Sequence, residues 1–202
     1  MEAPTKKRQL AESSSTAVST TTDLVLAIRG NVLLELSKDG TVVGTLLVSS
    51  HVLALASPVF DAMFNGSFAE GQGLSSAPPK KMALPDDDPK SMILLCKIVH
   101  MQTKDLVQEP SFKELADIAI VCDKYRCTES VRWWLRFWIT KKLALPEARN
   151  FEKLIFVTYL CDLPQEFEEV TLACMLHYKD LSKMYPSLTH GSGYVPMQIV
   201  GK

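Results

Sequence analysis

One stretch of the chain reads Val48-Ser49-Ser50-His51-Val52-Leu53-Ala54-Leu55-Ala56-Ser57-Pro58-Val59-Phe60-Asp61-Ala62-Met63-Phe64. Its apolar residues form two groups, and serine precedes each group. A serine hydroxyl can accept a hydrogen bond from a free backbone N–H in the first turn of a helix. We therefore expect Ser49 or Ser50 to cap a helix over His51–Ala56.

The second half of this stretch predicts another helix, which begins at Ser57-Pro58. Proline is tolerated at the first helical position because the N–H that it lacks has no partner there. One helical face is apolar and is expected in the core; it carries Phe60, Met63 and Phe64. Asn65-Gly66 is expected to end the helix in the left-handed conformation that glycine adopts readily.

The residues before the quoted stretch have the pattern of a β-hairpin. Order is expected to begin near Leu24, and alternate residues of the segment 32–37 are apolar, which is the period of a strand. Asp39-Gly40 supplies the positive φ angles of a tight turn. Thr41–Val48 is then expected to return as the second strand.

The residues after the quoted stretch predict one short strand, Met82–Leu84, and then only helices. The helices are expected from Asp88-Pro89 to about Met101, after a capping box at Ser111–Glu114, from a Thr128 cap over Glu129–Leu143, and from Pro146 and Pro164 onward. Strands followed by helices favour an α+β fold.

Composition limits the classes of partner. The formal net charge is −1, so the chain has no general positive field for nucleic acid or an anionic membrane. Gly40–Phe60 carries no charge, but polar residues and proline break it into a strand pattern and a helix pattern, so we expect no membrane span. The five cysteines include no Cys-x-x-Cys pair, which favours free thiols in a reducing compartment, the cytoplasm, the nucleus or both.

The N-terminal residues 1–22 are rich in serine and threonine and are expected to form a disordered tail. The run Lys6-Lys7-Arg8 within it is interpreted as solvated charge, and a nuclear address is the alternative.

No catalytic, cofactor or metal site is expected. Asp86-Asp87-Asp88 is interpreted as an acidic loop that ends in a helix cap. Cys174 and His177 are interpreted as a core thiol and a surface imidazole, since a closed zinc site needs four ligands. Four aromatic residues of one helix are interpreted as core rather than as a base-stacking surface: Trp133, Trp134, Phe137 and Trp138.

The quoted stretch closely resembles the signature of the BTB/POZ domain. Three further parts of the chain resemble the same family in the same order. Gly30–Leu36 resembles its first core strand, and Met82–Pro89 its third strand and exit. Leu115–Ala119, with Asp123-Lys124-Tyr125, resembles its fourth helix. The proline-rich acidic connection and the sequence Val48-Ser49-Ser50-His51 are most similar to BTB proteins of filamentous fungi. The helices after Pro146 resemble a short helical extension that follows the BTB domain.

This resemblance implies a small three-stranded sheet covered by helices, at residues 23–143. A helical extension at 144–185 and a flexible tail at 186–202 would follow. Members of the family self-associate, recruit repressors or act as adaptors for cullin-based ubiquitin ligases. The resemblance therefore implies a non-enzymatic protein-interaction module, with a second copy or a cullin as its partner. The alternative is a nuclear transcription cofactor or corepressor-type scaffold.

The expected partner interface consists of Met63, Phe64, Phe112 and Glu114. Phe112-Lys113-Glu114 resembles the hydrophobic-x-Glu motif with which cullin-binding members enter their fourth helix. The alternative is structural, because Ser111 and Glu114 already make sense as a capping box and the Phe112 ring can pack inward.

Two positions depart from the family pattern. Many members carry an acidic residue at the start of the first strand and a basic one before the signature helix, and these form a charged pocket at the dimer interface. Here the positions hold Asn31 and Ser50, so neither charge exists. A dimer at that surface would lack the ion pair.

Overall fold

The computed structural model describes residues 22–104, 106, 109–144 and 151–177. They form a mixed four-stranded sheet and seven α-helices. The strands are β1 (Thr22–Val25), β2 (Val32–Lys38), β3 (Thr41–Val48) and β4 (Lys80–Leu84). The helices are α1 (Ser50–Ala56), α2 (Pro58–Asn65), α3 (Pro89–Val99), α4 (Phe112–Lys124), α5 (Thr128–Leu143), α6 (Phe151–Leu160) and α7 (Pro164–His177). The α+β class is confirmed.

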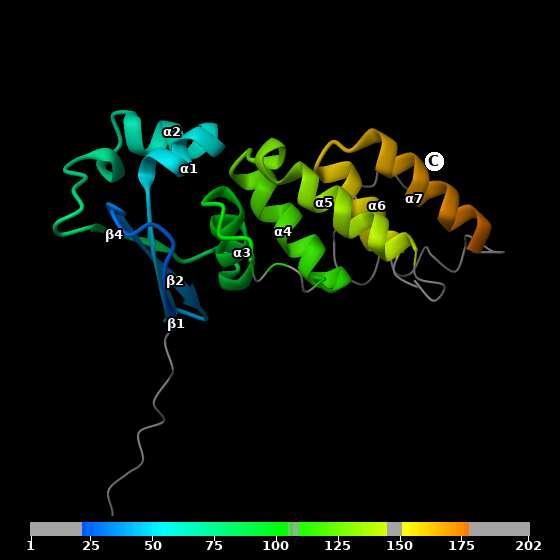
Figure 1. Cartoon of the computed structure of the whole chain (residues 1–202), viewed down its shortest axis with the longest axis horizontal. Helices are drawn as coiled ribbons and strands as arrows, with labels where there is room; N and C mark the ends of the chain where they lie inside the picture. The colour runs from blue at the N-terminus through cyan, green and yellow to red at the C-terminus, as the bar shows by residue number, and fades with distance from the viewer. Residues whose placement is uncertain (1–21, 105, 107–108, 145–150, 178–202) are drawn as a thin grey trace, which may run out of the picture.

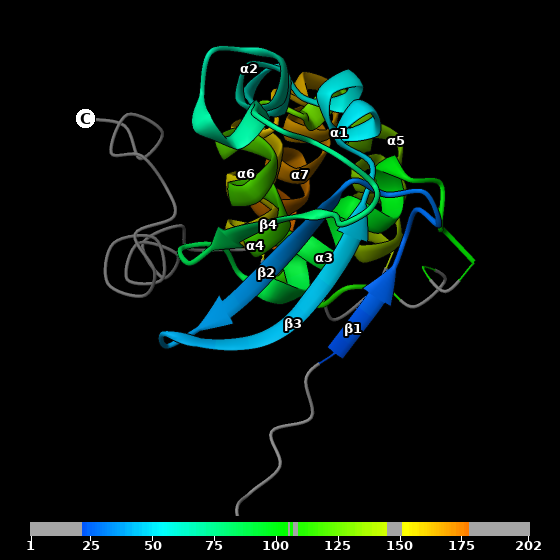
Figure 2. The ribbon, with the colours of Figure 1, turned by 90° about the vertical axis from the view of Figure 1, so that its left-hand side faces the viewer.

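The sheet lies at one end of the molecule, and α3 to α7 follow one another away from it (Figure 1). Figure 2 looks onto the sheet, with these helices behind it. Val32, Leu34 and Leu36 point toward the helices and are fully buried. The opposite face carries polar residues, among them Glu35, which pairs with Lys81 at 3.3 Å. One face of the sheet is therefore the floor of the core.

The centre of the sheet is the predicted hairpin of β2 and β3. Asp39 and Gly40 have φ angles of 52° and 75°, as the Asp-Gly turn requires. The expected count of three strands is wrong, because Thr22–Val25 pairs in parallel with Gly44–Leu47 and gives the order β1-β3-β2-β4. The expected tail therefore ends one residue too late, at Thr22, and its residues 1–21, with Lys6-Lys7-Arg8, lie outside the described residues.

The helical hairpin of α1 and α2 has the predicted serine caps. Ser49 Oγ accepts from the Val52 N–H, and Ser57 Oγ accepts from the Phe60 N–H at 3.1 Å. The expected left-handed end of α2 is wrong, because Gly66 has φ −80° and ψ −168°, which is extended backbone. Gly66 instead permits a close approach, since a Cβ there would lie 2.3 Å from the Ala62 carbonyl oxygen.

Two later helices begin as expected. The capping box of α4 is complete, with the Glu114 N–H donating to Ser111 Oγ and the Ser111 N–H donating to Glu114 Oε2. Pro164 begins α7. The expected Thr128 cap is wrong, because Thr128 is the first residue of α5 and the N-cap is Cys127, whose side chain makes no capping bond.

Of the expected C-terminal extension, α6 and α7 are described, whereas Pro146 and residues 178–202 lie outside the described residues. Phe151, Leu154 and Val157 of α6 belong to the same hydrophobic cluster as the sheet and α4. Within the described ranges, none of the helices combines the length and apolarity that crossing a bilayer requires.

Phe60 holds the hairpin of α1 and α2 to the rest of the core. Its side chain is 1 % exposed, and its ring stacks on Tyr125 at 4.3 Å and on Phe64 at 5.8 Å between centroids.

We predict that Phe60→Ala lowers the free energy of unfolding by about 3–5 kcal/mol, because it removes both ring contacts and leaves a cavity. Chemical denaturation measures this change. Leu55→Ala is the control on the neighbouring helix, since Leu55 is 91 % exposed and its loss should change stability little. Equal stability of the two variants would show that Phe60 does not carry this packing.

Candidate protein-interaction surfaces

Two hollows lie at opposite ends of α4. The first, called the α2 groove, has a volume of about 520 Å³ and is lined by Pro58, Val59, Ala62, Met63, Phe68, Glu70 and Arg126. The second, called the α3–α4 hollow, has a volume of about 290 Å³ and is lined by Lys90, Ser91, Leu94, Leu106, Glu109, Pro110 and Glu114. A 13-residue helix is roughly 20 Å long, so the two are separate surfaces.

The α2 groove has an apolar floor with one cationic and one anionic residue at its edge. Phe60 and Phe64 point from α2 into the core, which leaves Val59 and Met63 for the groove. Phe68, which is 57 % exposed, closes the groove from the segment after α2. Such a surface can take an apolar side chain and orient it through its charged edge.

The segment that carries Phe68 is tied to the sheet and to α2. Lys80 of β4 donates from Nζ to the carbonyl oxygens of Ala69 and Gln72. A Cβ at Gly71 would lie 2.3 Å from the Phe64 carbonyl oxygen, so glycine allows the segment to touch α2. These contacts hold the wall of the groove in place.

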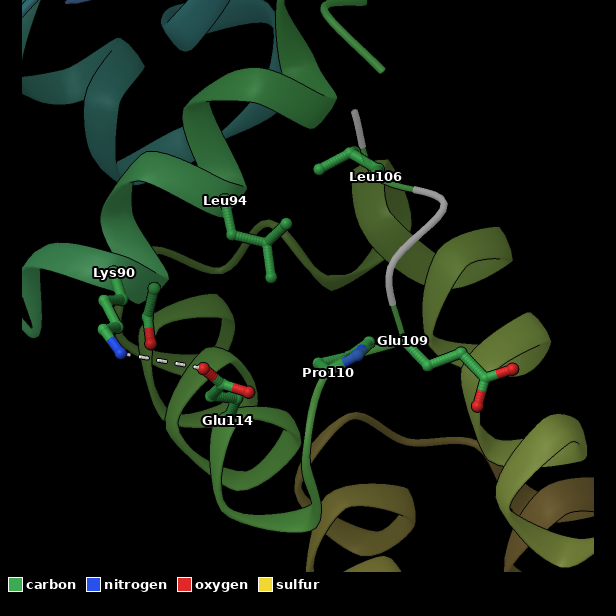
Figure 3. A pocket seen from close by; sticks show the side chains of 7 residues that line it. Lys90, Leu94, Leu106, Glu109, Pro110 and Glu114 are labelled. Atoms are coloured by element: carbon green, nitrogen blue, oxygen red, sulfur yellow. Dashed lines mark ion pairs between the residues drawn. The ribbon is translucent and has the colours of Figure 1, made fainter. Parts of the chain in front are cut away.

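The α3–α4 hollow is more polar. Figure 3 shows the Lys90 side chain directed at Glu114, with 3.9 Å between Lys90 Nζ and Glu114 Oε1, and the Glu109 carboxylate directed away from both. The pKa of Glu114 is lowered, chiefly by the hydrogen bond from the Ser111 backbone. Glu114 is therefore ionised at neutral pH and already bonded within its own helix cap.

Phe112, the first residue of α4, is half-buried against the core. Lys142 Nζ lies 5.4 Å from the centre of the Phe112 ring and 3.8 Å from Glu109 Oε2. The long Lys142 side chain thus covers one face of the ring, while its ammonium group pairs with Glu109, which lines the hollow.

The four residues of the expected interface do not form one surface. Phe112 and Glu114 lie in the first turn of α4 but on different sides of it, Phe112 beside Lys142 of α5 and Glu114 beside Lys90 of α3. Met63 lines the α2 groove, beyond the other end of α4. Phe64 is 3 % exposed and packs in the core, so its side chain offers no contact surface to a partner. Sequence reasoning missed Val59, Phe68 and Arg126, because only the tertiary structure brings them together.

Asn31 and Ser50 contact each other. Asn31 Nδ2 donates to Ser50 Oγ at 2.9 Å, and the Ser50 N–H donates to Asn31 Oδ1 at 2.9 Å. A neutral pair of hydrogen bonds therefore ties the start of β2 to the start of α1.

The acidic loop before α3 has two structural roles. Asp88 caps the helix by accepting from the Ser91 N–H at 2.9 Å, as predicted. Asp87 is buried and accepts from Lys124 Nζ and from the Tyr125 hydroxyl, each at 2.7 Å.

All five cysteines are buried thiols rather than halves of disulfides. Burial raises the pKa of Cys161 to about 12 and raises that of Cys96 further. Cys96 and Cys161 are therefore protonated at neutral pH. Cys174 is buried and His177 exposed, as predicted. Among the described residues, no group of three or more His, Cys, Asp and Glu side chains could hold a metal ion.

The interpretation of the aromatic cluster on α5 as core is wrong for two of its members. Trp138 is buried and Trp134 half-buried, but Trp133 is 78 % and Phe137 47 % exposed. Helical period places the four rings on two sides of α5, and neighbouring helices cover only one of them.

A scan against protein-family models found no matching family, and a search of curated proteins found no similar one. The resemblance to the BTB/POZ domain thus stays a prediction.

His100 joins α3 to the start of α1. Its Nε2 accepts from the Ser49 N–H at 3.1 Å, and its Nδ1 lies 2.9 Å from the Cys96 carbonyl oxygen. An imidazole that accepts at Nε2 must be neutral, so Nδ1 is the donor here. Burial lowers the pKa of His100 below its ordinary value of 6.5, which agrees with this state.

We predict that the free energy of unfolding falls as the pH is lowered from 7 to about 5 and that His100 contributes to this fall. The lowered folded pKa means that the unfolded chain binds the proton first, so the stabilisation is complete above pH 6.5 and is lost through the folded pKa. Denaturation of wild-type protein and His100→Gln at both pH values measures the contribution. His51→Gln, at an exposed position, is the control, and an unchanged pH dependence in His100→Gln would contradict the assignment.

Proposed function

We propose that the chain is a non-enzymatic protein–protein interaction module of the BTB/POZ type that recruits a protein partner through the α2 groove. The observation that carries the proposal is the open apolar floor of that groove, with Phe68 more than half exposed beside Val59 and Met63. Interface cores are enriched in aromatic residues and methionine, which supply contact area.

The charges at the groove support a peptide segment as the ligand. Arg126 is exposed at the turn after α4, and Glu70 is exposed on the segment that carries Phe68; both line the groove. A bound segment with an apolar side chain would bury that side chain between the walls. Polar groups on either side would then meet one cation and one anion, which sets the direction of the segment.

We predict that Phe68→Ser weakens capture of the groove's partner at least about tenfold, since aromatic anchors dominate interface energies. Affinity purification from the native source, with quantitative mass spectrometry, compares wild type, Phe68→Ser and the control Ile28→Ser. Ile28 is equally apolar and highly exposed but lies in the β1–β2 connection. A protein lost only with Phe68→Ser is then produced and its affinity measured directly. Partners that survive Phe68→Ser unchanged would contradict the role of the groove.

A cullin is the named candidate for a second surface, at the start of α4. Phe112 and Glu114 both belong to the first turn of α4, where the hydrophobic-x-Glu motif stands in the family, and Glu114 lines the α3–α4 hollow. The competing explanation is structural, because Glu114 completes the capping box and Phe112 packs partly inward.

We predict that a purified cullin N-terminal domain binds the wild type and loses most of that affinity with Phe112→Ala and with Glu114→Gln. Glutamine can replace glutamate in a capping box, so Glu114→Gln removes the charge and keeps the helix cap. Calorimetry gives the affinity, and thermal unfolding shows whether each variant is folded. If the wild type binds no cullin, the adaptor proposal is wrong. The α2 groove, which the cullin proposal does not involve, would then be the only proposed partner site, as in a corepressor-type scaffold.

A further inference from the structure

Helix α5 carries a stripe of four side chains on its outer face, spaced four residues apart. The stripe, called the α5 stripe, consists of Glu129, Trp133, Phe137 and Lys141. All four are exposed, and the two aromatic rings lie between an anion at one end and a cation at the other. The opposite face of the helix carries the buried residues Val131, Leu135 and Trp138.

The two charged residues at the ends of the stripe have different contacts. Glu129 accepts hydrogen bonds from Arg132, one turn along the same helix. Lys141 Nζ lies 5.7 Å from the centre of the Phe137 ring, and no carboxylate of the described residues is paired with it. The aromatic centre thus continues into a cation that is available to a partner.

We propose that the α5 stripe is a self-complementary surface through which a second copy of this chain binds in antiparallel orientation. Along the stripe, Glu129 and Lys141 lie six residues on either side of residue 135, and Trp133 and Phe137 lie two residues on either side. Each ring thus has a ring as its counterpart, and each charge has the opposite charge. A two-fold axis at that level places Trp133 against Phe137 of the second copy and Glu129 against Lys141 of the second copy, twice. This is the pattern of an isologous dimer, in which one patch contacts itself.

Helix packing geometry agrees with this pairing. Side chains spaced four residues apart form a ridge inclined to the helix axis by about 26°. Two such ridges run along each other when the helices cross at about 50°, which is the commonest packing class in globular proteins. Residues 129 and 141 are about 18 Å apart along the helix, so each charged pair lies about 9 Å from the two-fold axis, at the edge of the contact.

The size of the stripe indicates a weak dimer. Aromatic side chains bury about 150–250 Å² each, so four partly exposed rings contribute on the order of 500–700 Å². Stable interfaces bury about 1,200–2,000 Å² in total. We therefore expect association in the micromolar range or weaker. The charged pairs mainly fix the orientation, because exposed ion pairs contribute little affinity.

This inference deepens the proposed function by naming a second copy as one partner, and it rests on that function only in treating the chain as an interaction module. It uses a surface on α5, whereas partner recruitment was assigned to the α2 groove. Phe68→Ser should therefore leave self-association unchanged, and loss of the stripe should leave a folded chain with an intact groove. Failure of either proposal can be recognised without the other.

Sedimentation of the full chain from about 10 to 500 µM tests the proposal. Trp133→Ala is expected to raise the dimer dissociation constant at least about tenfold. Glu129→Lys and Lys141→Glu alone should each raise it about two- to tenfold, because each places like charges opposite one another at both ends. The double variant Glu129→Lys/Lys141→Glu should restore the wild-type value, since it reverses both signs and recreates the attraction.

Thermal unfolding of each variant separates loss of association from loss of fold, and Leu172→Ala, at an exposed apolar position of α7, is the matched control. A wild type that stays monomeric over the whole range would overturn the proposal. So would a dimer that Trp133→Ala leaves intact, or a double variant no better than the single ones. Quenching of Trp133 fluorescence by a single-stranded oligonucleotide, without any dimer, would assign the stripe to nucleic acid instead.

Discussion

Tyr125 ties together three segments that are far apart in the sequence. Its ring stacks on Phe60 of α2, its carbonyl oxygen accepts from Ser57 Oγ at 2.5 Å, and its hydroxyl donates to Asp87 at 2.7 Å. Burial and the Asp87 carboxylate both raise the pKa of Tyr125, so the hydroxyl stays a donor. The helical hairpin, the loop between β4 and α3, and the turn from α4 to α5 therefore meet at this one buried side chain. Losing it would leave Asp87 buried with one hydrogen bond fewer, which is costly in a region of low dielectric.

The candidate surfaces depend on this junction. Arg126 follows Tyr125 directly with a φ angle of 50°, and this turn places its side chain at the edge of the α2 groove. Ser57, which bonds to Tyr125, also caps α2 and so sets the direction of the helix that forms the floor of the groove. The turn ends at Cys127, where α5 and its outer stripe begin. One buried contact thus positions two surfaces that are themselves exposed.

Local signals predicted the elements whose cause is local. The serine caps, the Asp39-Gly40 turn and the capping box of α4 each need only a few neighbouring residues, and each is present. β1 could not be predicted, because four residues become a strand only by pairing with Gly44–Leu47, about twenty positions later. Likewise, the helical period of 3.6 residues placed Trp133 and Trp138 on different sides of α5. Which of these sides is buried depends on how α3, α4 and α7 pack against α5. Of the expected interface, Phe64 lies in the core, on the apolar helical face that the sequence period itself predicted.

In the proposed dimer, the groove and the stripe can be used at the same time. Arg126, at the groove, and Glu129, at the end of the stripe, are three residues apart, so the two surfaces adjoin without sharing a residue. The two-fold axis lies at the level of residue 135, about 10 Å along α5 from its first residue, Thr128. The groove adjoins that end of α5, so an antiparallel pair carries its two grooves toward opposite ends, with the two helix starts on the order of 20 Å apart along the helices. A partner with two suitable segments would bind such a pair more tightly than a monomer, because the second contact becomes intramolecular. Even a weak dimer can then raise the affinity for a partner that carries repeated motifs.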